Sequence, residues 1–247
     1  MSLLDLLQRS TEKFATRAAL VSGDRSLTYG ELWEVVKRLG AGFRRLGVEP
    51  GERVGLMLPN VPEFVQVYFG ILAAQGTVVP LNVLYKGEEV RYILEDAATR
   101  RIVTSRMFLP VIQAVREKLT YPLQVILVDG AVGGDSWIIS GSDLLRETAA
   151  PAHHEVAVCL YTSGTTGRPK GALLSHRNLL SNMTAFRQIA PCDEQDVFLC
   201  VLPLFHSYGA TVLMLFPLDI GAAIVLEPRF VPDQTMRVMA EKRVTVF

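Results

Sequence analysis

Apolar residues recur along the chain at helical spacing and at strand spacing in turn, which predicts alternating helices and strands. Residues 3–14 carry the spacing of an amphipathic helix, and residues 18–21 read as a strand. Thr28 followed by Glu31 is a capping-box pattern, in which two side chains satisfy the first free amides of a helix. The pattern predicts a helix that begins there and stops at Gly47.

The alternation continues to residue 128 and sets the expected fold class. The predicted strands span residues 53–58, 77–82, 101–104 and 125–128, and the predicted helices span residues 62–75, 88–96 and 107–118. A strand–helix–strand order favours parallel neighbours, because the crossover returns the chain to the same end of the sheet. We therefore expect an α/β fold, a layered α/β sandwich with largely parallel sheets.

Residues 131–151 form the weakest stretch for regular structure, with the run Gly133-Gly134-Asp135-Ser136 and a final Pro151. We interpret this stretch as a seam, that is, a boundary between subdomains, which predicts a first α/β subdomain over residues 1–150. It also predicts an incomplete second α/β subdomain over residues 151–247.

Residues 197–218 carry no formal charge and are long enough to cross a bilayer. However, this segment includes Pro203, His206, Gly209 and Pro217, and it has no clean basic flank. We expect a buried strand, a loop and a buried helix instead of a transmembrane span. Soluble expression without detergent would exclude the membrane alternative.

Composition narrows the classes of function. The 25 basic and 25 acidic residues cancel, so no positive field points to nucleic acid as a partner. Cys159, Cys192 and Cys200 lack metal-ligand spacing and lie in apolar stretches, so we expect buried free thiols and assign no metal ligand. The chain does not open with a basic and then apolar leader. These features favour a cytoplasmic protein.

The most informative segment is the loop at residues 161–171, Tyr-Thr-Ser-Gly-Thr-Thr-Gly-Arg-Pro-Lys-Gly, after a strand predicted at residues 156–160. Glycines let backbone amides approach a ligand, and hydroxyls and a lysine add donors, so the loop suits a polyphosphate. It differs from a Walker loop, because Arg168-Pro169 separates Gly167 from the lysine and Gly171 follows it. A polar turn between two strands is the alternative.

Four segments together resemble the adenylate-forming family, which includes acyl-CoA synthetases, luciferases and peptide-synthetase adenylation domains. Residues 161–171 look like the signature loop of that family. Residues 27–32, 74–82 and 203–209 (Pro-Leu-Phe-His-Ser-Tyr-Gly) match further family patterns in the same order. The resemblance spans nearly the whole chain. It implies the N-terminal part of the large domain of an acyl-CoA synthetase, similar to a long-chain-fatty-acid–CoA ligase.

The resemblance implies a two-step reaction. A carboxylate attacks the α-phosphate of ATP to give an acyl-adenylate and pyrophosphate, and coenzyme A then displaces AMP to give a thioester. Lys170 would neutralise phosphate charge as a mobile ammonium and so contribute to catalysis. The residues implied to hold the β- and γ-phosphates and the departing pyrophosphate are Thr162, Ser163, Gly164, Thr165, Thr166, Gly167 and Lys170.

His206 is the second catalytic candidate. The resemblance places it near the carboxylate and the α-phosphate, where an imidazole would donate a hydrogen bond or swing as a gate. Because it lies between two apolar runs, the alternative is a buried structural histidine whose hydrogen bonds are made within the core. For His153, His154 and His176 we expect structural positions only.

Family members are normally much longer, and their remaining ligands would lie beyond Phe247. These are the glutamate that holds Mg²⁺, the aspartate that binds the ribose and a catalytic lysine. We expect the N-terminal portion of a ligase for a fatty or arylalkanoic acid, with weak ATP affinity and no thioester formation of its own. An open sheet edge would favour self-association as a homo-oligomer. The alternative is a non-catalytic nucleotide-binding or interaction module.

Overall fold

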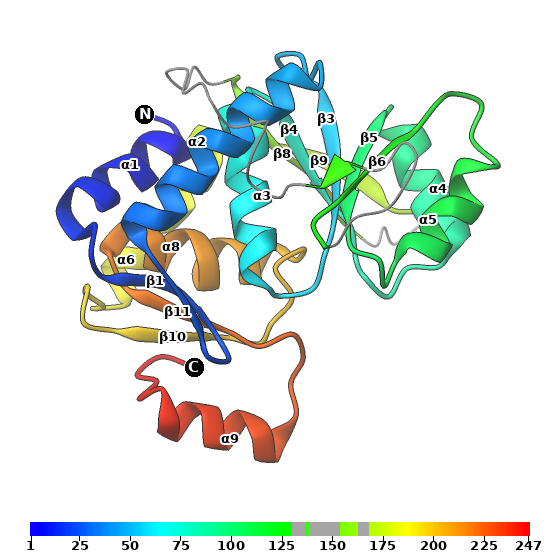
Figure 1. Ribbon diagram of the computed structural model, residues 1–247. Coiled ribbons are helices and arrows are strands. Elements are labelled where there is room, and N and C mark those ends of the chain that lie inside the picture. Colours follow the sequence, from blue (N-terminus) through cyan, green and yellow to red (C-terminus); the bar gives the residue numbers. More distant parts are fainter. Residues whose placement is uncertain (130–136, 139–153, 163–167) are drawn as a thin grey trace. The chain divides into compact units, whose positions relative to one another are not determined.

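The chain is described here as a computed structural model, which covers residues 1–129, 137–138, 154–162 and 168–247 (Figure 1). It folds into two compact units that interleave along the sequence. The first unit comprises Met1–Val36, Pro59–Gln66 and His176–Phe247, and the second comprises Lys37–Leu58 and Val67–Ser175.

The second unit is built on a seven-stranded sheet with the order β7-β6-β5-β3-β4-β8-β9. Each neighbouring pair is parallel except β8 and β9, which are antiparallel, so the predicted α/β fold with a largely parallel sheet is confirmed. The apolar strands are buried because helices cover a parallel sheet. Their bounds are β3 Arg53–Met57, β4 Thr77–Pro80, β5 Arg101–Thr104, β6 Gln124–Leu127, β7 Trp137–Ile138, β8 Val156–Thr162 and β9 Lys170–Ser175.

Two amphipathic helices, α4 (Gly87–Asp96) and α5 (Leu109–Arg116), pack against this sheet and lie together beside β5 and β6 in Figure 1. Val90 of α4 and Ile112 of α5 share a buried cluster with Met57 of β3. The burial of these apolar faces fixes the orientation of α4, and the opposite polar positions of the helix remain near solvent.

The helices α2 (Tyr29–Arg45) and α3 (Pro62–Ala73) approach each other closely in the second unit. A Cβ at Gly40 would lie 2.6 Å from the Cβ of Ala73, so a larger residue would force the helices apart. The predicted capping box starts α2: the Thr28 amide donates to Glu31 Oε2 at 2.8 Å, and the Glu31 amide donates to Thr28 Oγ1 at 3.2 Å.

The first unit contains a four-stranded sheet with the order β10-β11-β1-β2. β1 forms an antiparallel hairpin with β2, whereas β11 pairs in parallel with both β1 and β10. The strands are β1 Ala18–Ser22, β2 Arg25–Thr28, β10 Val197–Cys200 and β11 Ala223–Leu226. The helices are α1 Leu3–Phe14, α6 His176–Ile189, α7 Ser207–Ala210, η1 Thr211–Leu215, α8 Phe216–Ile220 and α9 Pro232–Glu241.

The long apolar segment forms the predicted strand, loop and buried helix. After β10 and a short loop, α7, η1 and α8 follow one another without a break to Gly221, which has φ 87°. A Cβ at Gly221 would lie 2.3 Å from Cδ2 of Phe14, so this turn packs directly against α1. Among the described residues, every helix is too short or too polar to cross a bilayer.

The compact units follow a different division from the two subdomains predicted from the sequence. β8 and β9 come after the predicted seam, yet β8 pairs with β4 in the same sheet. Pairing between distant strands, rather than adjacency along the chain, decides this arrangement. Residues 139–153 lie outside the described ranges, so the seam itself stays a prediction.

Candidate functional site

The predicted phosphate loop connects β8 to β9 at one edge of the seven-stranded sheet. Thr162, the last residue of β8, lies opposite Lys170, the first residue of β9, and both are exposed. The structure therefore brings together one predicted ligand-binding residue from each strand. The remaining loop candidates lie outside the described residues: Ser163, Gly164, Thr165, Thr166 and Gly167.

Helix α4 contacts the first strand of this hairpin through Tyr161. The Tyr161 hydroxyl donates to Asp96 Oδ2 at 2.5 Å, although the two residues are 65 positions apart in the sequence. Burial, together with the hydrogen bond to Asp96, raises the pKa of Tyr161, so its hydroxyl remains a donor at neutral pH. This contact fixes the backbone immediately before Thr162.

The same helix contacts the chain immediately before the second strand of the hairpin, at Pro169. The Tyr92 hydroxyl donates to the Pro169 carbonyl at 3.1 Å. The guanidinium carbon of Arg168 lies 5.5 Å from the centroid of the Tyr92 ring, which is within the range of a cation–π interaction. Both sides of the loop are thus held by α4.

Gly171 makes room for Tyr161. The two residues are partners in the β8–β9 register. A Cβ at Gly171 would lie 3.0 Å from Tyr161 Cζ and 3.0 Å from Cys159 Sγ. A side chain after Lys170 would therefore displace the tyrosine that reaches Asp96, which gives a physical reason for glycine at this position.

His206, the other catalytic candidate, is exposed and belongs to the first unit. It caps α7, because its Nδ1 accepts a hydrogen bond from the Tyr208 amide at 3.3 Å. With Nδ1 as an acceptor, the neutral ring carries its proton on Nε2. The local backbone therefore presents His206 as a hydrogen-bond donor.

A buried amide that sequence reasoning missed holds the loop before His206. Asn60 is 3% exposed, and its side-chain nitrogen donates to the Leu202 carbonyl at 2.9 Å and to the Cys200 carbonyl at 3.3 Å. Its Oδ1 accepts from the Leu204 amide at 3.0 Å. The apolar pattern predicted a strand over residues 53–58 and gave Asn60 no role in the site. The available signal was a lone amide between two apolar runs, because buried amides are almost always hydrogen-bonded.

Steric crowding explains why the Pro-Leu-Phe-His-Ser-Tyr-Gly segment ends in a glycine. A Cβ at Gly209 would lie 2.3 Å from the Pro203 carbonyl oxygen, so the chain can fold back over Pro203 only with glycine there. The π-helical turn η1 follows directly, and such turns are frequent at functional sites.

The other histidines of the described residues take structural positions. His176 begins α6 as predicted and is buried, with Nδ1 accepting from the Leu3 amide at 3.2 Å. His154 Nδ1 accepts from the Val156 amide at 3.3 Å. His153 lies outside the described residues. Within the described ranges, no group of three or more His, Cys, Asp or Glu could hold a metal ion.

The three cysteines are free thiols, but they are not all buried. Burial raises the pKa of the Cys200 thiol to about 12, and Cys159 is also buried. Cys192 is only partly buried, because it lies in the turn that follows α6. The expectation of burial is therefore wrong for Cys192.

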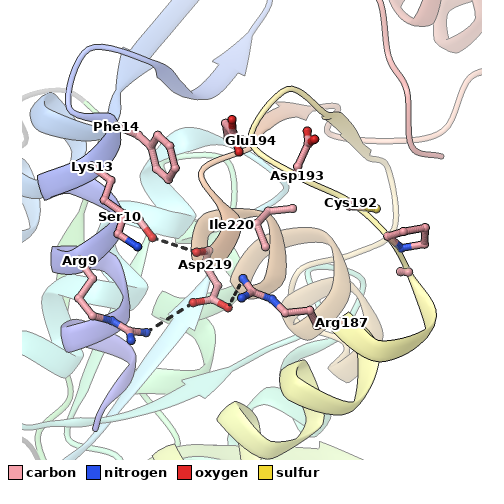
Figure 2. Close-up of a pocket in the computed structure, with 12 residues that line it drawn as sticks. Arg9, Ser10, Lys13, Phe14, Arg187, Cys192, Asp193, Glu194, Asp219 and Ile220 are labelled. Atoms are coloured by element: carbon pink, nitrogen blue, oxygen red, sulfur yellow. Dashed lines mark hydrogen bonds and ion pairs between the residues drawn. The ribbon is translucent and has the colours of Figure 1, made fainter.

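A cavity of about 370 Å³ lies in the first unit, between α1, α8 and the end of α6 (Figure 2). Asp219 forms ion pairs there with Arg9 at 3.6 Å and with Arg187 at 3.0 Å. Asp193 and Glu194 add two carboxylates to the lining, which balance Lys13 and the one arginine charge that Asp219 does not offset. The arrangement joins three helices through Asp219, and it leaves no net charge to select an ionic ligand.

Known proteins are similar to this chain both in sequence and in fold. The profile described as AMP-binding enzyme matches residues 7–247. A long-chain-fatty-acid–CoA ligase from Bacillus subtilis is 28% identical over 100% of this chain and 50% of its own length. An oxalate–CoA ligase from Arabidopsis thaliana is 34% identical over 91% of this chain and 45% of its own length.

A solved structure agrees with these relatives. The crystal structure of an anthranilate CoA ligase in complex with anthranoyl-AMP superposes with a TM-score of 0.90 at 27% identity. It covers 99% of this chain and 49% of that protein. The chain thus spans about half the length of the relatives it matches. On the match over residues 7–247, the chain belongs to the AMP-binding enzyme family.

Proposed function

We propose that this chain supplies the phosphate-binding part of an ATP-dependent carboxylate–CoA ligase, which forms an acyl-adenylate and then an acyl-CoA. The observation that carries the proposal is the β8–β9 hairpin, which sets Thr162 opposite Lys170 in a chain of the AMP-binding enzyme family. The names of the matched relatives, which are CoA ligases, support the reaction class.

In this proposal the hairpin holds the β- and γ-phosphates and the pyrophosphate that leaves. The Lys170 ammonium offsets phosphate charge, and the Thr162 hydroxyl donates to a phosphate oxygen. Backbone amides and hydroxyls of the connecting residues, Ser163, Gly164, Thr165, Thr166 and Gly167, complete the set. Such groups accelerate phosphoryl chemistry by positioning and by charge stabilisation.

His206 acts at the carboxylate end in this proposal. Its Nε2 proton would donate to the substrate carboxylate or to the α-phosphate, because Nδ1 is occupied by the Tyr208 amide. Coenzyme A is the proposed thiol co-substrate. Mg²⁺ would accompany ATP, but the described residues contain no metal-binding cluster, so we assign it no ligand in this chain.

For the acid we propose a fatty or arylalkanoic acid. The buried aliphatic residues Val212, Leu213, Met214 and Leu215 follow His206 closely and support an apolar acyl group. The matched relatives act on long-chain fatty acids and on oxalate by their names, so the family alone leaves the acid open.

Three further expectations belong to the proposal. Residues 1–247 alone bind ATP weakly and form no thioester, and the protein acts in the cytoplasm. Self-association would use the sheet edge at β9, where Leu173 is 51% exposed. A monomer by light scattering at high concentration would contradict the last of these.

Two measurements on this chain test the function. Exchange of labelled pyrophosphate into ATP, with fatty, arylalkanoic and amino acids offered separately, should show no turnover, and clear turnover would contradict the expected inactivity. Thermal-shift titrations with acyl-sulfamoyl-adenosine analogues of the same acids should favour the fatty or aryl analogue. Stabilisation by the aminoacyl analogue alone would contradict the proposed acid. ATP binding with no preference among analogues would favour the non-catalytic nucleotide-binding module.

A further inference from the structure

We propose that Tyr92 and Asp96 of α4 are positioning residues for the phosphate site, because they hold Thr162 and Lys170 on opposite strands in register for one ligand. This inference rests on the proposed function of the hairpin. It assigns a role to two residues that lie outside every motif quoted above and are far from the loop in the sequence.

The two contacts come from one face of one helix. Tyr92 and Asp96 are four positions apart on α4, so their side chains are neighbours on the helix surface. Asp96 accepts from Tyr161, next to Thr162, and Tyr92 donates to Pro169, next to Lys170. A shift of α4 would therefore move both strands of the hairpin together.

The contacts are anchored in the core of the second unit. The rings of Tyr92 and Tyr161 pack against the buried cluster that includes Val90 and Ile112, while their hydroxyls reach polar partners. An aromatic ring with one apolar face and one polar tip suits this bridging position. The register of the hairpin is thereby tied to the packing of α4 on the sheet.

The other charged groups of α4 are engaged elsewhere. Arg91 pairs with Glu88 at 2.9 Å and with Glu95 at 3.4 Å, and Lys118 pairs with Glu88 at 2.9 Å. Glu95 therefore provides a matched comparison with Asp96. Each contributes one carboxylate on adjacent positions of α4, but only Asp96 accepts a hydrogen bond from Tyr161.

Charge and positioning predict opposite effects of removing Asp96. A carboxylate near an anion site repels the ligand, so a purely electrostatic role predicts tighter binding in Asp96→Ala. A positioning role predicts weaker binding, because Tyr161 loses its acceptor and the start of the loop is released. The sign of the change in affinity thus distinguishes the two roles.

The test is the titration of inorganic pyrophosphate into the 247-residue chain by calorimetry. Asp96→Ala and Tyr161→Phe should each weaken binding about tenfold, as expected for one lost hydrogen bond to a charged group. Asp96→Asn should stay close to the wild-type affinity, because its amide oxygen accepts from Tyr161.

Glu95→Ala should bind as tightly as the wild type or more tightly. The double variant Asp96→Ala/Tyr161→Phe should be no weaker than either single variant.

Amide hydrogen exchange without ligand tests the anchoring separately. Exchange at Thr162 and Lys170 should accelerate in Asp96→Ala and in Tyr92→Phe, and should be unchanged in Glu95→Ala. Equal exchange in Asp96→Ala and Glu95→Ala would overturn the anchoring, as would tighter pyrophosphate binding in Asp96→Ala. If Asp96→Ala fails to fold, Tyr161→Phe decides the same point.

The two readouts also separate this inference from the function beneath it. Wild-type chain that binds no pyrophosphate overturns the proposed function, and the positioning role with it, even where exchange confirms the anchoring. Pyrophosphate binding that is insensitive to Asp96→Ala and Tyr161→Phe overturns only the positioning role.

Discussion

The hairpin around Thr162 and Lys170 in the second unit and the segment from Cys200 to Gly209 in the first unit each carry predicted site residues, and they are held in different ways. Tyr92 and Asp96 of the neighbouring helix α4 hold the hairpin at a partly buried surface, through hydrogen bonds with Pro169 and Tyr161. The buried amide of Asn60 holds the segment before His206 by bonding directly to its backbone. The first set of contacts lies at a partly exposed surface, whereas the second is part of the folded core.

The largest expected effect is at Asn60. Asn60→Ala removes the side-chain hydrogen bonds with Cys200, Leu202 and Leu204 and leaves the Leu204 amide buried without its partner, so we expect a loss of roughly 3 kcal/mol in the free energy of unfolding. Urea unfolding measures this change. Asn182→Ala, at an exposed position of α6, is the control and should change stability by less than about 0.5 kcal/mol. Equal effects at the two positions would contradict the structural role of the buried Asn60 amide.

One added methyl group in each region sharpens the comparison. Gly209→Ala places Cβ 2.3 Å from a backbone oxygen that cannot move aside, so we expect a loss of about 2–3 kcal/mol. Gly171→Ala meets the movable side chains of Tyr161 and Cys159 at 3.0 Å, so we expect a loss of about 1 kcal/mol or less in stability. The same urea titrations compare the two. A larger loss for Gly171→Ala would reverse the assignment of the rigid region.

The smallest expected change separates two roles of His206. His206→Ala removes the helix cap of α7 and should cost about 1 kcal/mol of stability. His206→Asn keeps a side-chain acceptor for the Tyr208 amide and should retain most of that stability, while it removes the imidazole donor. Calorimetric unfolding of the two variants gives the difference. Equal destabilisation by both substitutions would show that the cap contributes little.

The local structure of this chain could be predicted from its sequence because the signals are local. The apolar spacing of residues 3–14 gave the helix Leu3–Phe14, and the pair Thr28 and Glu31 gave the start of α2. Thr162 and Lys170 are also brought together locally, since β8 and β9 follow one another in the sequence and pair in antiparallel register.

The hydrogen bonds that hold the candidate site residues in place could not be predicted, because their partners are distant in the sequence. Asn60 bonds to residues about 140 positions away, and Asp96 bonds to Tyr161 over 65 positions. The interleaved units have the same origin, since β1 near the start of the chain pairs with β11 near its end. No spacing rule within one segment encodes such contacts.

The most direct test of the account is the affinity of the chain for pyrophosphate in the wild type and in Lys170→Ala. Lys118→Ala is the control, because Lys118 is exposed and its ammonium pairs with Glu88 at the start of α4, not with a residue of the hairpin. We predict that Lys170→Ala weakens binding at least about tenfold, as expected for the loss of one charge-assisted hydrogen bond, with unchanged thermal stability. Lys118→Ala should leave the affinity unchanged. Equal affinities of the wild type and Lys170→Ala would contradict the assignment of this hairpin as the phosphate site.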